Sequence, residues 1–165
     1  MNKISIIREA AEKAMSAETD RTKQLLGRAE KFAAGIIVLA GFQLWNLTGM
    51  LDPSSRWISD LCYLSLGVLS LSLLLALYSM RLKGYAGYPH GDKLWETLKS
   101  ENVSDNDAEQ AIIRLLLKNR EQNAKLNDAK TGLLFWCGWL FVVGFLLVII
   151  SRLLAALAYA YGSAM

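Results

Sequence analysis

The chain has 165 residues, of which 53% are hydrophobic and 20% charged, with a formal net charge of +3 at pH 7. The hydrophobic residues are gathered into long uncharged blocks, which argues against a single compact soluble core. The small net charge, spread over interleaved acids and bases, argues against a strongly basic nucleic-acid-binding protein, so we expect no nucleic-acid partner.

The first expected element is a helical arm over residues 1–31. Its apolar residues are separated by Glu, Lys and Arg, which is typical of a helix of modest amphipathicity. They are Ile4, Ile7, Ala11, Ala14, Met15, Leu25, Leu26 and Ala29. Between Thr22 and Phe32 only Gly27 disfavours a helix, by about 1 kcal/mol relative to alanine. We therefore expect the arm and the apolar block after it to form one continuous helix.

Two apolar blocks follow and predict a transmembrane hairpin over residues 32–80. Residues 32–51 carry no charge, and twenty residues at about 1.5 Å each span the roughly 30 Å hydrocarbon layer of a bilayer. Pro53 and its polar neighbours predict a tight turn. Residues 57–80 are apolar apart from Asp60 and scattered serines, so they form the second predicted span. Asp60 lies near the outer end of this span, where an acid can reach headgroup water.

A polar central segment covers residues 81–130. Its first part is rich in glycine and contains Pro89, so it is expected to be a loop, and His90 within it has no His or Cys partner for a zinc site. A short helix is expected around residues 93–100. Ser104 and Asp107 then form a capping signature for a long helix that continues past residue 130.

The last apolar block predicts a third transmembrane helix over residues 131–156. Arg152 near its end can extend its side chain to the far headgroups. Residues 157–165 follow as an outer tail. The predicted fold class is therefore an all-α integral membrane protein with three transmembrane helices, a helical cytoplasmic arm and a central helical segment.

The orientation of the spans follows from the basic residues. Seven lie at or before Lys31 and nine between Arg81 and Lys130, whereas Arg56 and Arg152 are the two that remain. The positive-inside rule places the arm and the central segment in the cytoplasm. We therefore expect a multi-pass protein of the bacterial inner membrane, with its N-terminus cytoplasmic and its C-terminus periplasmic.

The long helix of the central segment carries two faces that suggest contacts. The first is apolar and predicts a partner surface; it consists of Ala108, Ala111, Ile112, Leu115 and Leu116, with Ile112, Leu115 and Leu116 as its centre. The second, nearer the third span, has an asparagine every four residues with basic residues beside them. It consists of Lys118, Asn119, Arg120, Asn123, Lys125 and Asn127.

The asparagine face allows two interpretations. Buried asparagines in helix pairs commonly determine register or oligomeric state and contact no ligand. Alternatively, their amide groups and the neighbouring cations supply hydrogen bonds for a base edge and charge for a phosphate, which fits a nucleotide-sized ligand.

Polar side chains also occur within the first predicted span. Gln43, Asn46 and Thr48 either mediate helix packing or line a pore in a symmetric oligomer. Cys62 and Cys137 have no metal-ligand or redox spacing and are expected to be small buried side chains. No catalytic, metal-binding or phosphate-loop motif occurs in the sequence, so we expect neither a conventional enzyme nor a metal or cofactor, apart from a cyclic nucleotide as ligand.

The order of these elements resembles the small transmembrane effectors of bacterial antiphage systems. The likeness is to the Pycsar effectors, which respond to cyclic pyrimidine nucleotides. It is carried by the hairpin spans followed by YPHGDKLWETLK and AIIRLLLKNREQNAKLNDAKTGLLF. The resemblance implies a homo-oligomer that stays silent until a second messenger or protein partner arrives, then disrupts the inner membrane and stops the infected cell.

The expected function is therefore that of an antiphage membrane effector, which permeabilises or depolarises the inner membrane when a cytoplasmic signal is sensed. Two alternatives stay open. One is a non-conducting accessory subunit that anchors a cytoplasmic partner through the apolar face of the long helix. The other is a holin-like lysis protein, which would need no ligand.

Overall fold

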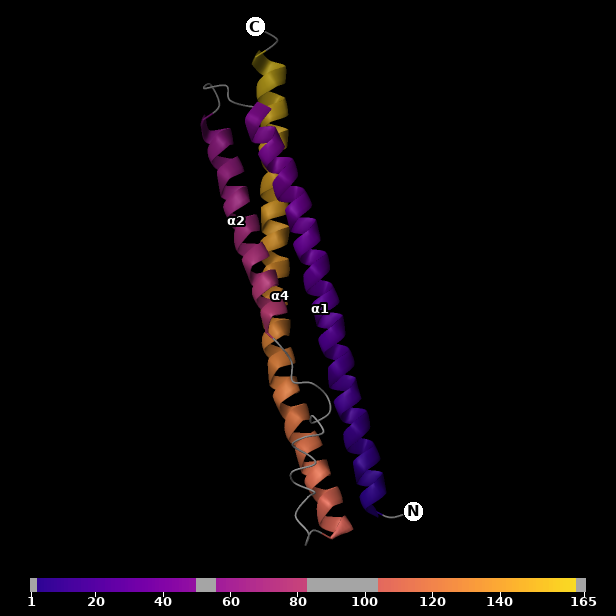
Figure 1. Ribbon diagram of the computed structural model, residues 1–165. Coiled ribbons are helices and arrows are strands. Elements are labelled where there is room, and N and C mark those ends of the chain that lie inside the picture. Colours follow the sequence, from indigo (N-terminus) through magenta and orange to yellow (C-terminus); the bar gives the residue numbers. More distant parts are fainter. Residues whose placement is uncertain (1–2, 50–55, 83–103, 163–165) are drawn as a thin grey trace. The chain divides into compact units, whose positions relative to one another are not determined.

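The structure is a computed structural model that describes residues 3–49, 56–82 and 104–162 (Figure 1). These residues form three helices, α1 over Lys3–Gly49, α2 over Arg56–Arg81 and α4 over Asp105–Gly162, and no strand occurs among them. The predicted all-helical fold is confirmed. The expected turn at 52–55, the loop with His90 and the short helix at 93–100 lie outside the described residues.

The two long helices begin and continue as their local sequences predict. Gly27 lies inside α1 without interrupting it, so the arm and the first apolar block form one helix. At the start of α4 the Asp107 N–H donates to Ser104 Oγ at 3.3 Å, and Ser104 Oγ donates to Asp107 Oδ2 at 2.6 Å. The Ser104 side chain thus satisfies one of the backbone donors that a helix leaves free at its first turn, and the Asp107 carboxylate holds the hydroxyl in place.

The chain divides into two compact units, and α1 and α4 each contribute to both. The arm unit comprises Met1–Leu26 and Leu82–Thr131, and the bundle unit comprises Gly27–Arg81 and Gly132–Met165. In the arm unit the described residues belong mainly to α1 and α4. In the bundle unit α1, α2 and α4 all take part.

In both units α1 and α4 run in the same direction. The Phe32 ring packs edge-on against Phe141 with centroids 6.1 Å apart, and further along both helices Gln43 contacts Ser151. Residue numbers therefore increase together on the two helices. The same order holds in the arm unit, where Met15 contacts Asn123 and Thr22 contacts Asn127.

Helix α2 runs antiparallel to α4, and its buried face is made mostly of small residues, with Ile58 and Leu69 as the large ones. Leu69 approaches Gly144, whereas the later residue Ser72 donates to the earlier carbonyl of Cys137 at 2.9 Å. The buried positions of α2 alternate in steps of four and three, the spacing of a left-handed helix bundle. They are Ile58, Cys62, Ser65, Leu69, Ser72, Ala76 and Ser79.

Small residues on α4 match those on α2. Cys137, Gly144 and Ser151 follow one another at seven-residue intervals and are all buried. Small side chains let helix backbones approach closely, which is how helices associate when no water has to be excluded. Cys62 and Cys137 are both buried free thiols, as the sequence predicts.

The bundle unit carries its large apolar side chains on the outside. Small and polar side chains such as Gln43, Ser65 and Ser72 are buried, whereas Trp45 is 80% exposed. Many other large side chains on its helices are exposed as well, among them Ile37, Val38, Phe42, Trp57, Tyr63, Leu64, Leu71, Leu74, Trp136, Trp139 and Leu153. A core that includes Ile36, Leu69 and Val148 is buried as well, but so much exposed apolar surface is unusual for a soluble protein.

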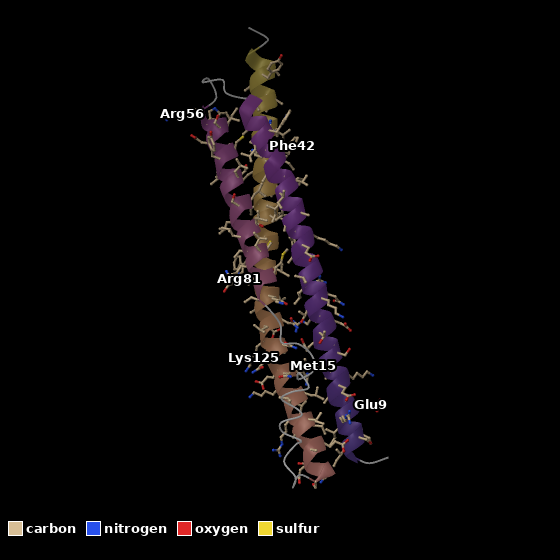
Figure 2. The ribbon with its side chains drawn as sticks, in the orientation of Figure 1. Glu9, Met15, Phe42, Arg56, Arg81 and Lys125 are labelled. Carbon is tan, nitrogen blue, oxygen red and sulfur yellow. The ribbon has the colours of Figure 1, made fainter. Side chains whose placement is uncertain are left out.

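Within the described residues, two helices are long and apolar enough to cross a membrane, α2 and α4. For the first predicted span, 32–51, the structure describes the backbone as far as residue 49 and the side chains as far as residue 45. Side-chain placement along the helices is shown in Figure 2.

Candidate functional site

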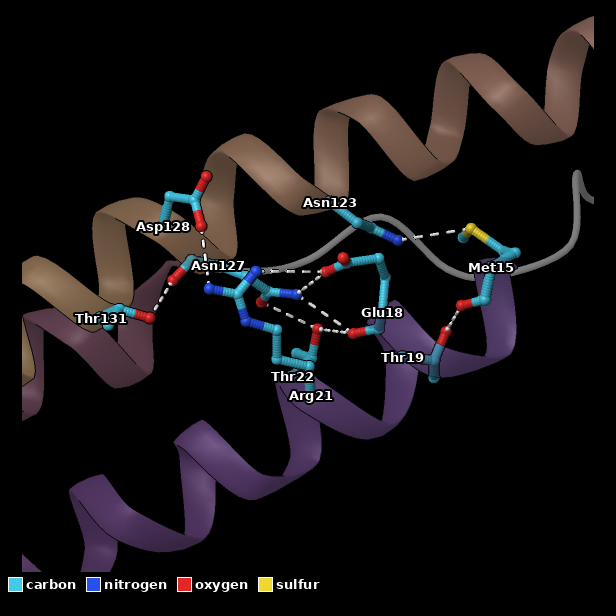
Figure 3. A network of polar contacts seen from close by, with 9 residues as sticks. All are labelled: Met15, Glu18, Thr19, Arg21, Thr22, Asn123, Asn127, Asp128 and Thr131. Carbon is cyan, nitrogen blue, oxygen red and sulfur yellow. Dashed lines mark hydrogen bonds and ion pairs between the residues drawn. The ribbon is translucent and has the colours of Figure 1, made fainter. Parts of the chain in front are cut away.

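The asparagine face of α4 lies against the arm portion of α1 (Figure 3). Asn123 and Asn127 are almost fully buried, at 2% and 1% exposure, and Asn119 is half-buried. The three residues share one side of α4 because they recur every four residues.

Asn127 uses its whole amide group within the arm unit. Its Nδ2 donates to Glu18 Oε2 at 2.9 Å and to the Glu18 carbonyl at 3.1 Å. Its Oδ1 accepts a hydrogen bond from Thr22 Oγ1 at 3.0 Å. Because a buried amide is costly unless its donors and acceptor are paired, these contacts determine how α1 and α4 align here.

Asn123 lies one turn earlier on α4 and faces Met15. Its Nδ2 is 3.8 Å from Met15 Sδ, and a thioether sulfur is only a weak acceptor. Thr19 Oγ1 donates to the Met15 carbonyl at 3.0 Å, and the Met15 side chain is directed at Asn123 (Figure 3). The contacts of Asn127 with Glu18 and Thr22 are shorter than the contact of Asn123 with Met15.

An ion pair lies at the edge of these contacts. Arg21 Nη2 is 2.8 Å from Asp128 Oδ1, and Arg21 Nη1 is 3.8 Å from Glu18 Oε2. Both Arg21 and Asp128 are substantially exposed, so solvent screens the pair and it is worth about 0–1 kcal/mol. We name Met15, Glu18, Arg21, Thr22, Asn123, Asn127 and Asp128 the polar seam.

The basic residues predicted beside the asparagines are exposed. Lys125 extends from the side of α4 away from α1 (Figure 2), and Lys118, seven residues earlier, shares that side. Lys125 Nζ is 2.7 Å from Glu121 Oε1, and this hydrogen bond holds the pKa of the Glu121 carboxyl below its ordinary value. The structure thus brings Asn123 and Asn127 together with the arm, whereas Lys118 and Lys125 lie on the opposite side of α4. Arg120, seven residues before Asn127, is an exposed residue of the asparagine side.

Lys130 is a basic residue of α4 that the sequence reasoning did not select. It is 5% exposed, and burial lowers the pKa of its ammonium group. It follows Asn127 by three residues, so the alternating steps of three and four that run through α4 could have identified it.

Of the predicted partner face, Leu116 is buried within the chain, and Ile112 and Leu115 are half-buried. Ile113, which the sequence analysis did not select, is buried as well. Leu116 and Ile113 lie on the same side of α4 as Asn127, because steps of three and four residues lead from one to the next. The prediction from the sequence did not extend the asparagine side of the helix to these two residues. In the arm, Ile7 and Leu26 were also predicted on the apolar face, yet they are 52% and 40% exposed.

Of the three polar residues selected in the first predicted span, the structure describes the side chain of Gln43. Gln43 is fully buried, and its Nε2 donates to Ser65 Oγ at 3.1 Å and to Ser151 Oγ at 3.4 Å. These contacts join three helices, which is the helix-packing role that the sequence left open. The side chains of Asn46 and Thr48 lie outside the described residues.

No family model matches the chain, and no curated protein or solved structure matches it either. The chemistry of its own residues is therefore the basis for a functional proposal.

Proposed function

We propose that the chain is an integral protein of the bacterial inner membrane that crosses the bilayer three times and makes the membrane permeable when a cytoplasmic signal acts on the arm unit. The observation that carries this proposal is the distribution of side chains in the bundle unit. Many large apolar residues cover its surface, and buried polar side chains such as Gln43 and Ser72 lie in its interior together with Ile36, Leu69 and Val148. Such a surface is stable in lipid and is a liability in water.

The proposed topology agrees with helix direction and with charge. Parallel α1 and α4 with antiparallel α2 correspond to an odd number of crossings, which puts the two ends of the chain on opposite sides of the membrane. Sixteen of the eighteen basic residues belong to the arm and the central segment, which then lie in the cytoplasm.

The polar seam is the proposed switch. A buried polar contact between helices, such as that of Asn127 with Glu18 and Thr22, costs more to form and less to separate than an all-apolar contact. A ligand shifts such an equilibrium only if it binds one arrangement better than the other. Because the arm occupies the asparagine amides, the favoured ligand is one that competes with the arm for Asn123 and Asn127.

A cyclic nucleotide has the matching chemistry. A base edge can replace the Glu18 and Thr22 groups that pair with Asn127, and its phosphate can pair with exposed arginines such as Arg21 or Arg120. The resemblance to the Pycsar effectors supports this ligand class and a homo-oligomeric state. Since α1 and α4 continue from the arm unit into the bundle unit, they provide the covalent connection between signal and membrane.

A non-conducting accessory subunit is the second candidate. It is favoured by the saturation of Asn127, whose amide hydrogen bonds are all made inside the chain. In that case the polar seam only aligns α1 and α4, and a cytoplasmic partner would bind elsewhere, because Leu116 of the predicted partner face is already buried.

Membrane potential and propidium uptake in cells that express the chain distinguish the candidates. Each strain is measured with and without a co-expressed cyclic-nucleotide cyclase. We expect depolarisation only when chain and cyclase are both present, and expect Arg120→Ala combined with Asn123→Ala to abolish it. Lys23→Ala, an exposed basic residue of the arm outside the polar seam, serves as the matched control and should respond as the unmodified chain does.

Each other outcome points to a different function. Depolarisation without the cyclase would support a holin-like protein. An intact membrane in every condition, with the chain shown to be in the membrane fraction, would contradict the effector proposal and leave the accessory subunit.

A further inference from the structure

A layer of three polar side chains crosses the interior of the bundle unit. Gln43 of α1, Ser65 of α2 and Ser151 of α4 are each at most 1% exposed. They come from all three helices and contact one another directly, with Gln43 Nε2 at 3.1 Å from Ser65 Oγ and 3.4 Å from Ser151 Oγ. We name these three residues the Gln43 layer.

Every hydrogen-bond donor of the Gln43 layer is in use. Ser65 Oγ donates to the Cys62 carbonyl at 2.8 Å, and Ser151 Oγ donates to the Val148 carbonyl at 2.8 Å. The two amide protons of Gln43 go to the two serine oxygens. Gln43 Oε1, in contrast, is buried and accepts no hydrogen bond from any residue that the structure describes.

The layer is therefore short of donors. If the Gln43 amide is turned by 180°, Oε1 accepts from the serine hydroxyls, but Nε2 then has no acceptor. One polar group of the amide is therefore unpaired in either orientation. A buried amide that lacks a partner is destabilising, and buried polar groups in proteins are paired with protein or with ordered water.

We propose that the Gln43 layer binds one water molecule. Water both donates and accepts, so it satisfies Gln43 in either amide orientation. Gln43 Oε1 and the remaining lone pairs of the two serine oxygens supply the two to four polar partners that a buried water requires.

An anion fits this layer less well, because it would need donors and all donors of the three side chains are already used. A cation would use the same lone pairs as a water, and the dependence of the signal on added salt separates the two. This inference does not depend on the proposed permeabilisation of the membrane.

Glutamine side chains provide a direct test in the full chain. The chain is labelled with ¹⁵N-glutamine and studied in detergent micelles, where Gln24, Gln43, Gln110 and Gln122 give four side-chain amide signals. We expect the Gln43 amide protons to show cross-peaks at the water frequency with opposite signs in NOE and ROE spectra, which is the mark of a long-lived bound water. The exposed Gln24 and Gln110 are internal references for surface hydration and exchange.

The signal is assigned from the spectrum of Gln43→Met, which lacks it. Absence of a water cross-peak at Gln43, in a sample whose Gln24 and Gln110 signals report normally, would overturn the proposal. A cross-peak that appears only with added sodium or potassium would overturn it too, because the layer would then be a cation site.

The unfolding equilibrium gives a second, independent readout. If water satisfies the layer, Gln43→Met loses paired hydrogen bonds and leaves the folded state equally stable or less stable than Gln24→Met, the exposed control on the same helix. In a dry layer Gln43→Met removes an unpaired acceptor together with the two Nε2 hydrogen bonds, so a net stabilisation of the fold, by roughly threefold or more in the unfolding equilibrium constant, is expected only of a dry layer. That stabilisation would contradict the bound water.

Discussion

Asn127 connects α1 and α4 through three hydrogen bonds that use its whole side-chain amide. Glu18 and Thr22, which provide these contacts, lie one turn apart on α1, so one buried amide engages two turns of the partner helix. The residue determines the alignment of two segments that are separated by about a hundred positions in the sequence. Its removal should therefore affect the arm and leave the bundle unit folded.

We expect Asn127→Ala to weaken the pairing of the arm with α4 by about 1–3 kcal/mol, because the Glu18 and Thr22 groups lose a buried partner. Hydrogen exchange over residues 11–26 should accelerate in proportion, whereas exchange in α2 should be unchanged. Lys125→Ala, which alters an exposed pair on the far side of α4, is the control. Unchanged exchange in the arm of Asn127→Ala would show that the polar seam does not hold it.

Lys130 makes stability depend on pH on the alkaline side. Burial lowers the pKa of its ammonium group in the folded state, so the unfolded state binds more protons and stability rises with pH through the window between the lowered and the ordinary value. Below the lowered pKa the full penalty for burying the charge is present. We expect Lys130→Met to be more stable than the unmodified chain at pH 7 and the difference to shrink towards pH 10.

Thermal unfolding of both proteins at several pH values measures that difference. Because the two proteins share every other titratable group, the difference between their stabilities reports on Lys130 alone. A constant difference across the range would mean that Lys130 has its ordinary pKa in the folded protein.

At the scale of the helices, close packing of α2 on α4 depends on glycine at one point. A Cβ on Gly144 would lie 2.7 Å from Leu69 Cδ2 and 2.9 Å from Leu69 Cγ, so the two helices approach within a distance that only hydrogen permits. Gly41 on α1 is the opposite case, since a Cβ there would meet nothing within 4 Å.

We expect Gly144→Ala to destabilise the bundle unit by about 1–3 kcal/mol through overpacking, and Leu69→Ala to compensate in the double variant. Gly41→Ala, the matched control, should be neutral or stabilising by up to about 1 kcal/mol, since alanine favours a helix. Chemical unfolding in detergent measures both. Equal effects of the two substitutions would contradict the close approach at Gly144.

At the scale of the whole molecule, the prediction concerns the number of membrane crossings. A three-span protein with a cytoplasmic N-terminus should give active alkaline phosphatase when the enzyme is fused after residue 53 or after residue 165, and inactive enzyme when it is fused after residue 92. A fluorescent protein fused at the same positions should show the inverse pattern. Activity after residue 53 but not after residue 165 would leave two spans and overturn the proposed topology.

Some features of this protein follow from its sequence because they are local. The cap at Ser104, the continuity of α1 through Gly27 and the all-helical fold each depend on residues within a few turns of one another. Backbone hydrogen bonds in a helix join residues four apart, so caps and breakers in the sequence determine where helices begin and continue.

Other features were decided only by contacts between distant segments. The sequence placed the centre of the apolar face of the long helix at Ile112, Leu115 and Leu116, whereas the structure buries Leu116 and Ile113, because the neighbours of α4 select which side of it is covered. The pairing of Asn127 with Glu18 and of Gln43 with Ser151 joins residues more than a hundred positions apart. A helix exposes side chains all around its axis, and its own sequence leaves several faces of similar polarity, so only the packing of other helices determines which side chains are buried.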